Sequence, residues 1–249
     1  MRFASMTVGE IAAAYPDATD IFTRYGIDYC CGGRRNFTEA TRSRGLDPDQ
    51  IGREIIGREK DAARLTGKRN PFSIPQIIDQ ILQYHHAYVR DKRQTLPPLA
   101  KKVASTHGGK HPELSAVSQL TENLFDELEN HMRKEEKILF PAILALVSHR
   151  ENGTPLPQVR FQSIAQPIAM MERDHSQTGR ELYGLQRITN DFTVPEDGCV
   201  SYKELCEKLR DVQAHIFEHL HLENNILFPR ALELERTLRE NPRDNGFSF

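Results

Sequence analysis

The sequence lacks several features that assign a chain to a protein class. It has no tryptophan, only 4 cysteines in 249 residues, and no long apolar run. Four cysteines are too few for a disulfide scaffold in a chain of this length. A membrane-spanning helix needs about 18 or more consecutive apolar residues, so the sequence predicts no membrane span.

An excess of charge of one sign is missing too. Lys and Arg number 33 and Asp and Glu number 35, which gives a formal net charge of −2. Binding to the phosphates of a nucleic acid requires a clear basic excess, so we expect no nucleic-acid partner. The first residues, from Met1 to Met6, lack the apolar segment of a secretory signal. We therefore expect a cytoplasmic protein.

Helix signals are abundant instead. Residues 1–57 contain short helical patterns separated by turn residues, and Thr7 with Glu10 predicts a capping box at the first of them. The polar stretch 58–73 predicts a linker. Ser73 precedes the next helical pattern and predicts its N-cap.

Four long amphipathic helices are predicted after the linker, joined by polar loops rich in Gly, Pro or Thr. Their expected spans are 74–104, 112–149, 159–190 and 201–239. No alternating pattern typical of a strand is present. We therefore predict an all-α fold: a small N-terminal helical domain followed by a four-helix bundle over residues 74–240.

The bundle region repeats itself with an offset of 88 residues. A His-x-x-x-Glu pattern followed by Ile-Leu-Phe-Pro begins at His131 and recurs at His219. Positions i and i+4 lie on one face of a helix, so His131 faces the same way as Glu135, and His219 the same way as Glu223. That face is also the apolar face, so the sequence predicts that all four groups point into the bundle.

Each half also has a histidine on its preceding helix. Antiparallel packing brings His85 level with His131, and His175 level with His219. Periodicity does not separate His85 from His86, because both can reach the interior.

The other histidines have different interpretations. His215, one turn before His219, is a rival ligand. We expect His221 to be next to the ligands or exposed, and we expect solvated positions in or near loops for three further residues: His107, His111 and His149. The prolines of the repeat are expected to kink or stop their helices: Pro141 and Pro229.

Four buried imidazoles and two buried carboxylates would be costly without a cation. They are too many ligands for one tetrahedral zinc. They suit two metal ions bridged by carboxylates, with iron favoured over manganese. This ligand set leaves coordination positions for a bridging oxo or hydroxo group and for a small ligand such as O₂ or NO.

Together these motifs resemble a known family. The repeat resembles hemerythrin-like di-iron domains, and the segment from Asp28 through Cys30 and Cys31 to Gly33 resembles the leading, ScdA_N-like domain of the Repair of Iron Centres proteins. The resemblance extends from about Val8 to Leu232. It implies a hemerythrin-like bundle that holds two bridged iron ions.

Carried over residue by residue, the resemblance implies a specific ligand set. Its members are His85, His131, Glu135, His175, His219 and Glu223. It favours His85 over His86, leaves His215 outside the set, and implies that both glutamates bridge the metals. The pattern departs from the oxygen-carrying hemerythrins, which have a fifth histidine and an aspartate, and this argues against simple reversible O₂ transport.

The resemblance also implies a function in stressed cells. Members restore iron–sulfur clusters damaged by nitric oxide or oxidative stress, and we expect this chain to do so by donating iron to apo or damaged iron–sulfur proteins. Two alternatives are reduction of NO to N₂O at the di-iron centre and a sensor that binds NO or O₂. An exposed thiol-bearing domain on a polar linker is compatible with a homodimer.

The adjacent cysteines are expected to carry chemistry of their own. A disulfide between Cys30 and Cys31 would be strained and easily reduced, which suits redox switching. A position near a helix N-terminus would lower the thiol pKa and favour the thiolate. We expect this pair to accept or pass iron, or to handle an NO-derived group. Cys199 and Cys206, near the start of the fourth long helix, are expected to be structural.

Overall fold

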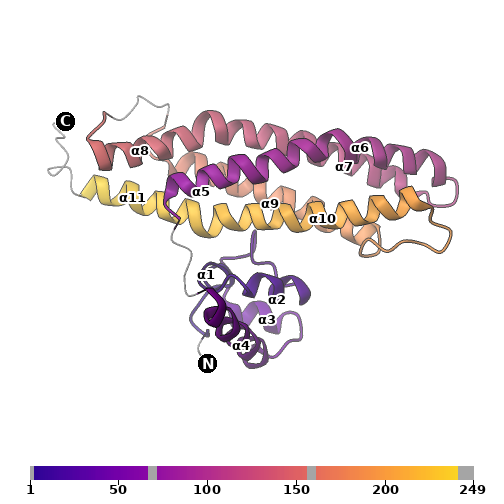
Figure 1. The fold of residues 1–249 in the computed structure, drawn as a ribbon, viewed down its shortest axis with the longest axis horizontal. Coiled ribbons are helices and arrows are strands. Elements are labelled where there is room, and N and C mark those ends of the chain that lie inside the picture. Colours follow the sequence, from indigo (N-terminus) through magenta and orange to yellow (C-terminus); the bar gives the residue numbers. More distant parts are fainter. Residues whose placement is uncertain (1–2, 67–71, 156–160, 241–249) are drawn as a thin grey trace.

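A computed structural model describes residues 3–66, 72–155 and 161–240, with the backbone alone for residues 59–66. Within these ranges the chain is helical and has no β-strand, so the predicted all-α fold is confirmed. A small domain of short helices lies beside a long helical bundle (Figure 1). No helix in the described ranges is long and apolar enough to cross a membrane.

The N-terminal domain contains four helices in its described part. They are α1 (Val8–Ala14), α2 (Ala18–Arg24), α3 (Phe37–Arg42) and α4 (Pro48–Thr66). The predicted capping box is present, since the Thr7 side chain accepts from the Glu10 N–H and the Glu10 side chain accepts from the Thr7 N–H. Gly26 follows α2 with a φ of 63°, a left-handed conformation that glycine adopts without strain.

The predicted linker at 58–73 begins as helix, because α4 continues through Thr66. Residues 67–71 of that linker lie outside the described residues. The residues between Arg58 and Gly67 are mostly Glu, Lys, Ala and Arg, which favour helix. No glycine or proline interrupts them. The linker was predicted from the polarity of these residues alone. Their helix propensity instead extends α4 into this segment.

The bundle consists of four long helical rods. The first is α5 (Ile74–Gln80), η1 (Ile81–His86) and α6 (Ala87–His107); the second is α7 (Glu113–Lys134), η2 (Glu135–Leu139) and α8 (Phe140–Asn152). The third is α9 (Ala165–Ile188), and the fourth is α10 (Val200–Leu222), η3 (Glu223–Leu227) and α11 (Phe228–Glu240). Ser73 is the N-cap of the first rod, as predicted, and it forms a capping box with Gln76.

Three of the rods contain a π-helical turn, labelled η1, η2 and η3. Neither Pro141 nor Pro229 stops its helix, since helix continues past both prolines. Proline lacks an N–H and clashes with the carbonyl four residues earlier in a regular helix. The wider π turn before each proline takes up this conflict, so the helix continues where a stop was one of the expected outcomes.

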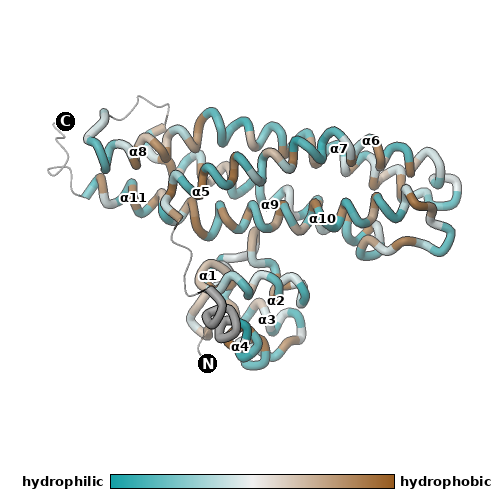
Figure 2. The backbone as a smooth tube through the Cα atoms, in the orientation of Figure 1, coloured by the Kyte–Doolittle hydropathy of each residue, from teal (hydrophilic) through white to brown (hydrophobic). Residues whose placement is uncertain are grey.

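The apolar core of the bundle is divided into two parts by a polar layer. One cluster contains residues such as Val89, Leu124 and Leu209 and continues into the N-terminal domain. The other contains residues such as Ile77, Leu139 and Phe228. Apolar residues recur along the bundle helices on both sides of this layer (Figure 2). The buried polar layer between the clusters holds the candidate site.

Candidate metal centre and the thiol turn beside it

The first group of candidate ligands joins three rods of the bundle. It consists of His86, Glu135, His219 and Glu223, all four of them fully buried. The Nε2 atom of His86 lies 3.3 Å from a Glu135 oxygen, and the Nε2 atom of His219 lies 3.2 Å from a Glu223 oxygen. One metal ion within this group would therefore take ligands from both halves of the repeat.

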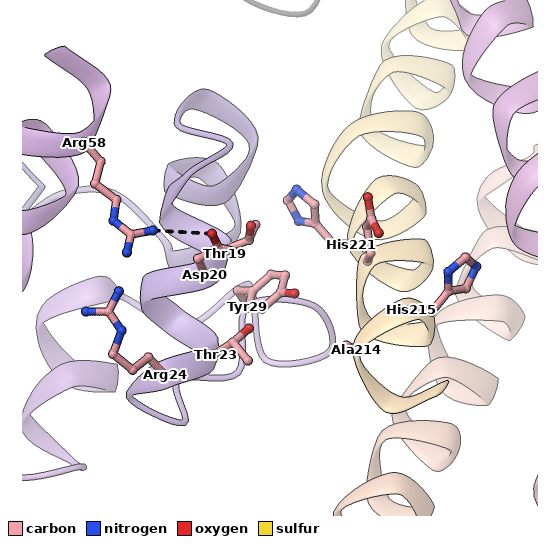
Figure 3. A pocket seen from close by; sticks show the side chains of 10 residues that line it. Thr19, Asp20, Thr23, Arg24, Tyr29, Arg58, Ala214, His215 and His221 are labelled. Carbon is pink, nitrogen blue, oxygen red and sulfur yellow. Dashed lines mark hydrogen bonds and ion pairs between the residues drawn. The ribbon is translucent and has the colours of Figure 1, made fainter. Parts of the chain in front are cut away.

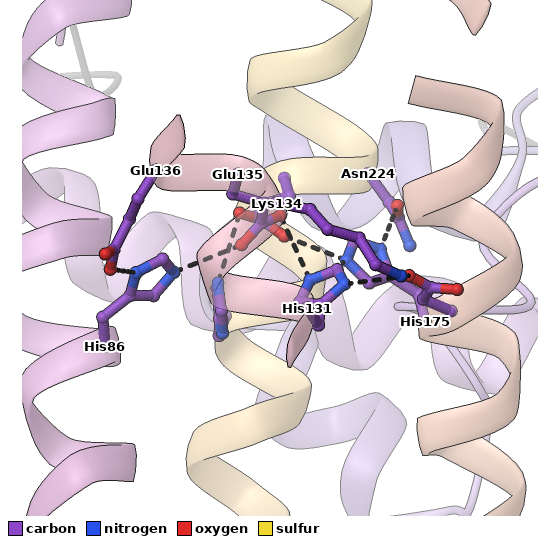
Figure 4. Close-up of polar contacts among 10 residues, drawn as sticks. His86, His131, Lys134, Glu135, Glu136, His175 and Asn224 are labelled. Carbon is purple, nitrogen blue, oxygen red and sulfur yellow. Dashed lines mark hydrogen bonds and ion pairs between the residues drawn. The ribbon is translucent and has the colours of Figure 1, made fainter. Parts of the chain in front are cut away.

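A second group shares both carboxylates with the first. It consists of His131, Glu135, His175 and Glu223. The Nε2 atom of His131 is 3.1 Å from Glu135, and that of His175 is 3.0 Å from Glu223 (Figure 4). The two Nε2 atoms are 3.0 Å apart. Glu135 and Glu223 thus stand between two candidate metal positions, the arrangement expected of bridging carboxylates.

The outer nitrogens of two imidazoles are held by acceptors. His86 donates from Nδ1 to Glu136 at 2.7 Å, and His175 donates from Nδ1 to the side-chain oxygen of Asn224 at 2.7 Å. A neutral imidazole that donates from Nδ1 presents a lone pair at Nε2. These two partners, Glu136 and Asn224, were not predicted from the sequence, although each directly follows a predicted glutamate ligand.

The inner atoms of the site lack hydrogen-bond partners. Both oxygens of Glu135 and both of Glu223 are buried without a hydrogen bond, as are Nε2 of His86 and both ring nitrogens of His219. Lone pairs facing carboxylate oxygens at 3.0–3.3 Å repel one another unless a cation lies between them. The residues present therefore fit a bound metal, with imidazole and carboxylate donors that suit iron.

The pKa shifts of the buried groups indicate the same need for positive charge in the site. Burial alone would raise the pKa of Glu223, but the facing imidazoles of His219 and His175 hold it well below its usual range. Burial would lower the pKa of His131, yet Glu135 and Asp174 raise it to about 10. Without a metal, protons on the imidazoles balance the buried carboxylates, and a bound cation would take over this role.

The prediction of His85 as a ligand differs from the structure, because His86 occupies that place in the first group. His85 is fully buried, but its Nδ1 faces Nε2 of His215 at 3.1 Å. Consecutive residues on a helix diverge by roughly 100°, so only one of the two histidines can face Glu135. The other five predicted ligands lie in the two groups, and the rival His215 lies outside both.

Other histidines also deviate from expectation. His149 was expected to be solvated, but it is buried at the end of α8, where its Nδ1 donates to the Thr154 carbonyl at 2.8 Å. His221 is buried beside the Tyr29 ring and lies outside both metal groups. His111 is half-buried in the loop before α7, near Asp197 and Glu113.

The thiol turn, which we define as Asp28 to Gly33, lies directly against the bundle. The Sγ atom of Cys31 donates to the backbone carbonyl of His175 at 3.2 Å. A Cβ atom added to Gly179 would lie 3.0 Å from that sulfur, so the absence of a side chain on α9 makes room for Cys31. The thiols are therefore in contact with the helix that carries a candidate ligand.

The turn does not place its thiols at a helix N-terminus, because α3 begins only at Phe37. The hydrogen bond with Cys31 and burial raise the pKa of Cys30 well above its usual range. The expected lowering of the thiol pKa is thus wrong for Cys30. Cys206 is buried in the core, whereas Cys199 is exposed at the N-cap of α10, 3.1 Å from Nε2 of His107.

Two asparagines of η3 connect the turn to the metal layer. The Asn224 amide donates to the Cys30 carbonyl at 3.1 Å while its oxygen accepts from His175. The Asn225 amide donates to the Tyr29 carbonyl at 2.9 Å and contacts Nδ1 of His221 at 2.9 Å. A change in the orientation of His175 would therefore be felt at the thiol turn through a single side chain.

Two clefts flank this contact between domain and bundle. A cleft of about 330 Å³ is lined by both cysteines, Arg34, Glu172 and Asn224. A larger one, of about 680 Å³, is lined by Asp20, Tyr29, His215 and His221, with an Arg58–Asp20 ion pair at its edge (Figure 3). The smaller cleft gives solvent a path to the thiols.

Comparison with known proteins agrees with this arrangement. Residues 77–231 match the family described as Hemerythrin HHE cation binding domain, and residues 4–57 match ScdA_N, described as Domain of Unknown function (DUF542). A "Probable iron-sulfur cluster repair protein" of Haemophilus influenzae is 32% identical, over 93% of this chain and 99% of the relative. The "Iron-sulfur cluster repair protein YtfE" of Escherichia coli O81 is also 32% identical, with the same coverage.

Proposed function

Because the chain belongs to the family of hemerythrin HHE cation-binding domain proteins, we propose that it repairs iron–sulfur clusters damaged by nitric oxide or oxidative stress. Relatives that align over nearly their whole length carry this function in their names. In this proposal the iron is cargo as well as a ligand-bound ion. It is held in the His/Glu layer and delivered to apo or damaged iron–sulfur proteins in the cytoplasm.

One observation carries the proposal more than any other. Two groups of four buried candidate ligands share Glu135 and Glu223, and the backbone carbonyl of His175 in the second group accepts from the Cys31 thiol at 3.2 Å. Two iron ions held in this layer would be bridged by both carboxylates, with room for an oxo or hydroxo bridge. Thiols beside such a store suit the delivery of iron to a protein whose own cluster ligands are sulfur.

In this proposal, residues of the chain both hold the iron and compensate the charge of the site after the iron leaves. The outer partners Glu136 and Asn224 orient two imidazoles, so their Nε2 lone pairs stay directed at the carboxylates. The buried oxygens of Glu135 and Glu223 have no other partner, which favours a bound cation. A protein that gives up iron must compensate these charges afterwards, and protonation of His131 provides one such charge.

The test is anaerobic transfer of iron from the loaded protein to an apo iron–sulfur protein, measured by the return of cluster absorbance with a sulfide source present. We expect Cys30→Ala and Cys31→Ala each to lose transfer while retaining the iron of the His/Glu layer. Equal transfer by these variants and the parent protein would remove the thiols from the proposal. No transfer by the parent protein would overturn the repair function itself.

The shared carboxylates also favour a second candidate, the reduction of nitric oxide. Two metal ions bridged by Glu135 and Glu223 would be close enough to act on two NO molecules together. The balanced reaction joins two NO with two electrons and two protons to give N₂O and water. Gas chromatography of the reduced protein under NO decides this: N₂O formation supports the candidate, and its absence under anaerobic turnover rejects it.

A further inference from the structure

A third cluster of ligand atoms lies outside the His/Glu layer, in the thiol turn. Asp28, Cys30 and Cys31 bring one carboxylate oxygen and two sulfurs within 4.8 Å of one another. The two sulfurs are 3.7 Å apart, and Oδ1 of Asp28 is 3.4 Å from the sulfur of Cys30. Thiol and carboxylate donors converge here on the N-terminal domain alone, independent of the bundle ligands.

These separations are close to those of a tetrahedral metal site. With metal–sulfur bonds of about 2.3 Å, two sulfurs on one tetrahedral ion are about 3.8 Å apart. With a metal–oxygen bond of about 2.1 Å, the oxygen and a sulfur are about 3.6 Å apart. The observed distances differ from these values by about 0.1–0.2 Å. These two separations therefore suit one ion, and the ligand atoms of Asp28 and Cys31 lie within 4.8 Å of each other.

The surroundings leave room for approach from one side. Cys30 is 3% exposed, whereas Cys31 is half-buried and, like Cys30, lines the cleft of about 330 Å³. Oxygen atoms are available nearby, since the His175 carbonyl is 3.2 Å from the sulfur of Cys31. The cluster is thus between the cleft and the helix that carries His175.

We propose that Asp28, Cys30 and Cys31 bind one thiophilic divalent metal ion at the junction of the N-terminal domain and the bundle. Binding forms two metal–sulfur bonds and one metal–oxygen bond, and the two thiol protons leave to solvent; no electrons are transferred. A role of this site as the transfer position between the His/Glu layer and a recipient protein rests on the proposed function. Binding itself does not depend on that function.

Asp28 also has a structural task that the test must separate. Its Oδ1 accepts the backbone N–H groups of Cys30 and Cys31, at 3.2 and 3.0 Å. An Asp28→Asn variant keeps a side-chain oxygen for these hydrogen bonds but removes the negative charge that ligates a cation. Asp28→Ala removes both, so comparison of the two variants distinguishes ligation from support of the turn.

The experiment uses the full chain, purified with its metal centre loaded, in a Cys199→Ser/Cys206→Ser background. In that background Cys30 and Cys31 are the only thiols of the chain. Anaerobic titration with Co²⁺ is followed by thiolate-to-cobalt charge-transfer absorption, which imidazole and carboxylate ligands do not produce. Equilibrium dialysis gives the number bound, and the Cys30→Ser/Cys31→Ser variant corrects for Co²⁺ held elsewhere.

We expect one thiolate-bound Co²⁺ per chain, loss of the absorption in Cys31→Ser, and at least a tenfold higher Kd in Asp28→Asn. No charge-transfer absorption in the parent background overturns the site, and an unchanged Kd in Asp28→Asn overturns Asp28 as a ligand. The iron-transfer assay is scored separately. Iron transfer without cobalt binding overturns the site and leaves the repair function standing, whereas cobalt binding without transfer keeps the site and overturns the function.

Discussion

His85 and His86 are adjacent on one helix, yet they leave it in different directions and meet different partners. His86 faces Glu135 and is oriented by Glu136, whereas His85 faces His215. We expect His86→Leu to lose about one of the two metal ions and His85→Leu to keep both. Elemental analysis of the anaerobically purified variants measures this difference. Loss of metal in His85→Leu alone would reinstate the ligand set implied by the family resemblance.

The ionised side chain of Glu181 destabilises the folded protein at neutral pH, and replacement of Glu181 should remove this destabilisation. Burial and the neighbouring Glu127 raise the pKa of Glu181, so its ionised form is disfavoured in the folded protein. A raised folded-state pKa gives a contribution that is present at low pH and lost as pH rises through that value. We expect Glu181→Gln to be more stable at pH 7 by about 0.5 kcal/mol, since half-exposed charges are screened, and equal to the parent below about pH 4.

Thermal unfolding at several pH values measures this difference. At this chain length the expected gain corresponds to about 1–2 °C in Tm at pH 7. The exposed Glu196 serves as the matched control, and Glu196→Gln should leave Tm unchanged. A gain of the same size at every pH would show that the side-chain shape, and not the charge of Glu181, is responsible.

At the residue scale, five of the six residues predicted as ligands lie in the two candidate groups, because the duplicated His-x-x-x-Glu pattern places them on one inward face. The position of His86, and not His85, in the first group was not predictable, since both positions satisfy helical periodicity and the π turn η1 alters the local phase. Glu136 and Asn224 were missed because a polar residue on a helix is ordinarily solvated. Their roles depend on neighbouring rods, which sequence spacing does not reveal.

Among the elements, the π turn η3 performs more than one task with consecutive residues. Glu223 faces the metal layer, Asn224 bridges His175 and Cys30, and Asn225 reaches Tyr29. A regular helix separates successive side chains by about 100°, and the wider turn changes that spacing. One element thereby connects the metal layer to the N-terminal domain, and α1 also packs against it.

Replacement of Asn224 should loosen this connection. Asn224→Leu leaves the Cys30 carbonyl and the His175 N–H without a partner, at a cost of about 1–3 kcal/mol. In the Cys199→Ser/Cys206→Ser background we expect thiol alkylation to be at least tenfold faster. The exposed Asn123 provides the control, and Asn123→Leu should alkylate at the parental rate. Parental rates in Asn224→Leu would mean that packing alone holds the thiol turn.

Helix existence was predictable at the element scale and helix continuity was not. Ser73 and Thr7 capped helices as expected, because their capping boxes are local interactions. Pro141 and Pro229 did not end their rods, because a π turn precedes each of them. The helix through Thr66 likewise follows from propensity that a composition-based linker assignment ignores.

For the molecule as a whole, the polar layer interrupts the apolar core. A metal bound in this layer would offset the cost of burying its carboxylates. Removal of metal leaves two buried carboxylates without hydrogen-bond partners, and the raised pKa of His131 balances only part of their charge. A ligand present at 100 times its Kd stabilises the fold by about 2.7 kcal/mol. We expect chelation to lower Tm by roughly 5–11 °C at this chain length.

Calorimetry of the loaded and chelated protein measures this effect. The Cys30→Ser/Cys31→Ser variant should show the same loss of Tm on chelation, because its His/Glu layer is unchanged. An equal Tm with and without metal would show that the layer does not depend on a cation. The packing of the N-terminal domain against η3 was the part of the molecule that the sequence did not reveal, since few residues carry it and none repeats.

Each candidate metal position draws two ligands from either half of the duplicated chain: His86 and Glu135 with His219 and Glu223, and His131 and Glu135 with His175 and Glu223. During synthesis on the ribosome the first half emerges with only its own histidines and glutamate, too few to complete either position. Neither position can therefore form until η3 has left the ribosome and the second half has packed against the first. Metal insertion into the proposed site would consequently be a late event of biosynthesis, and a chain truncated before Glu223 would complete neither position.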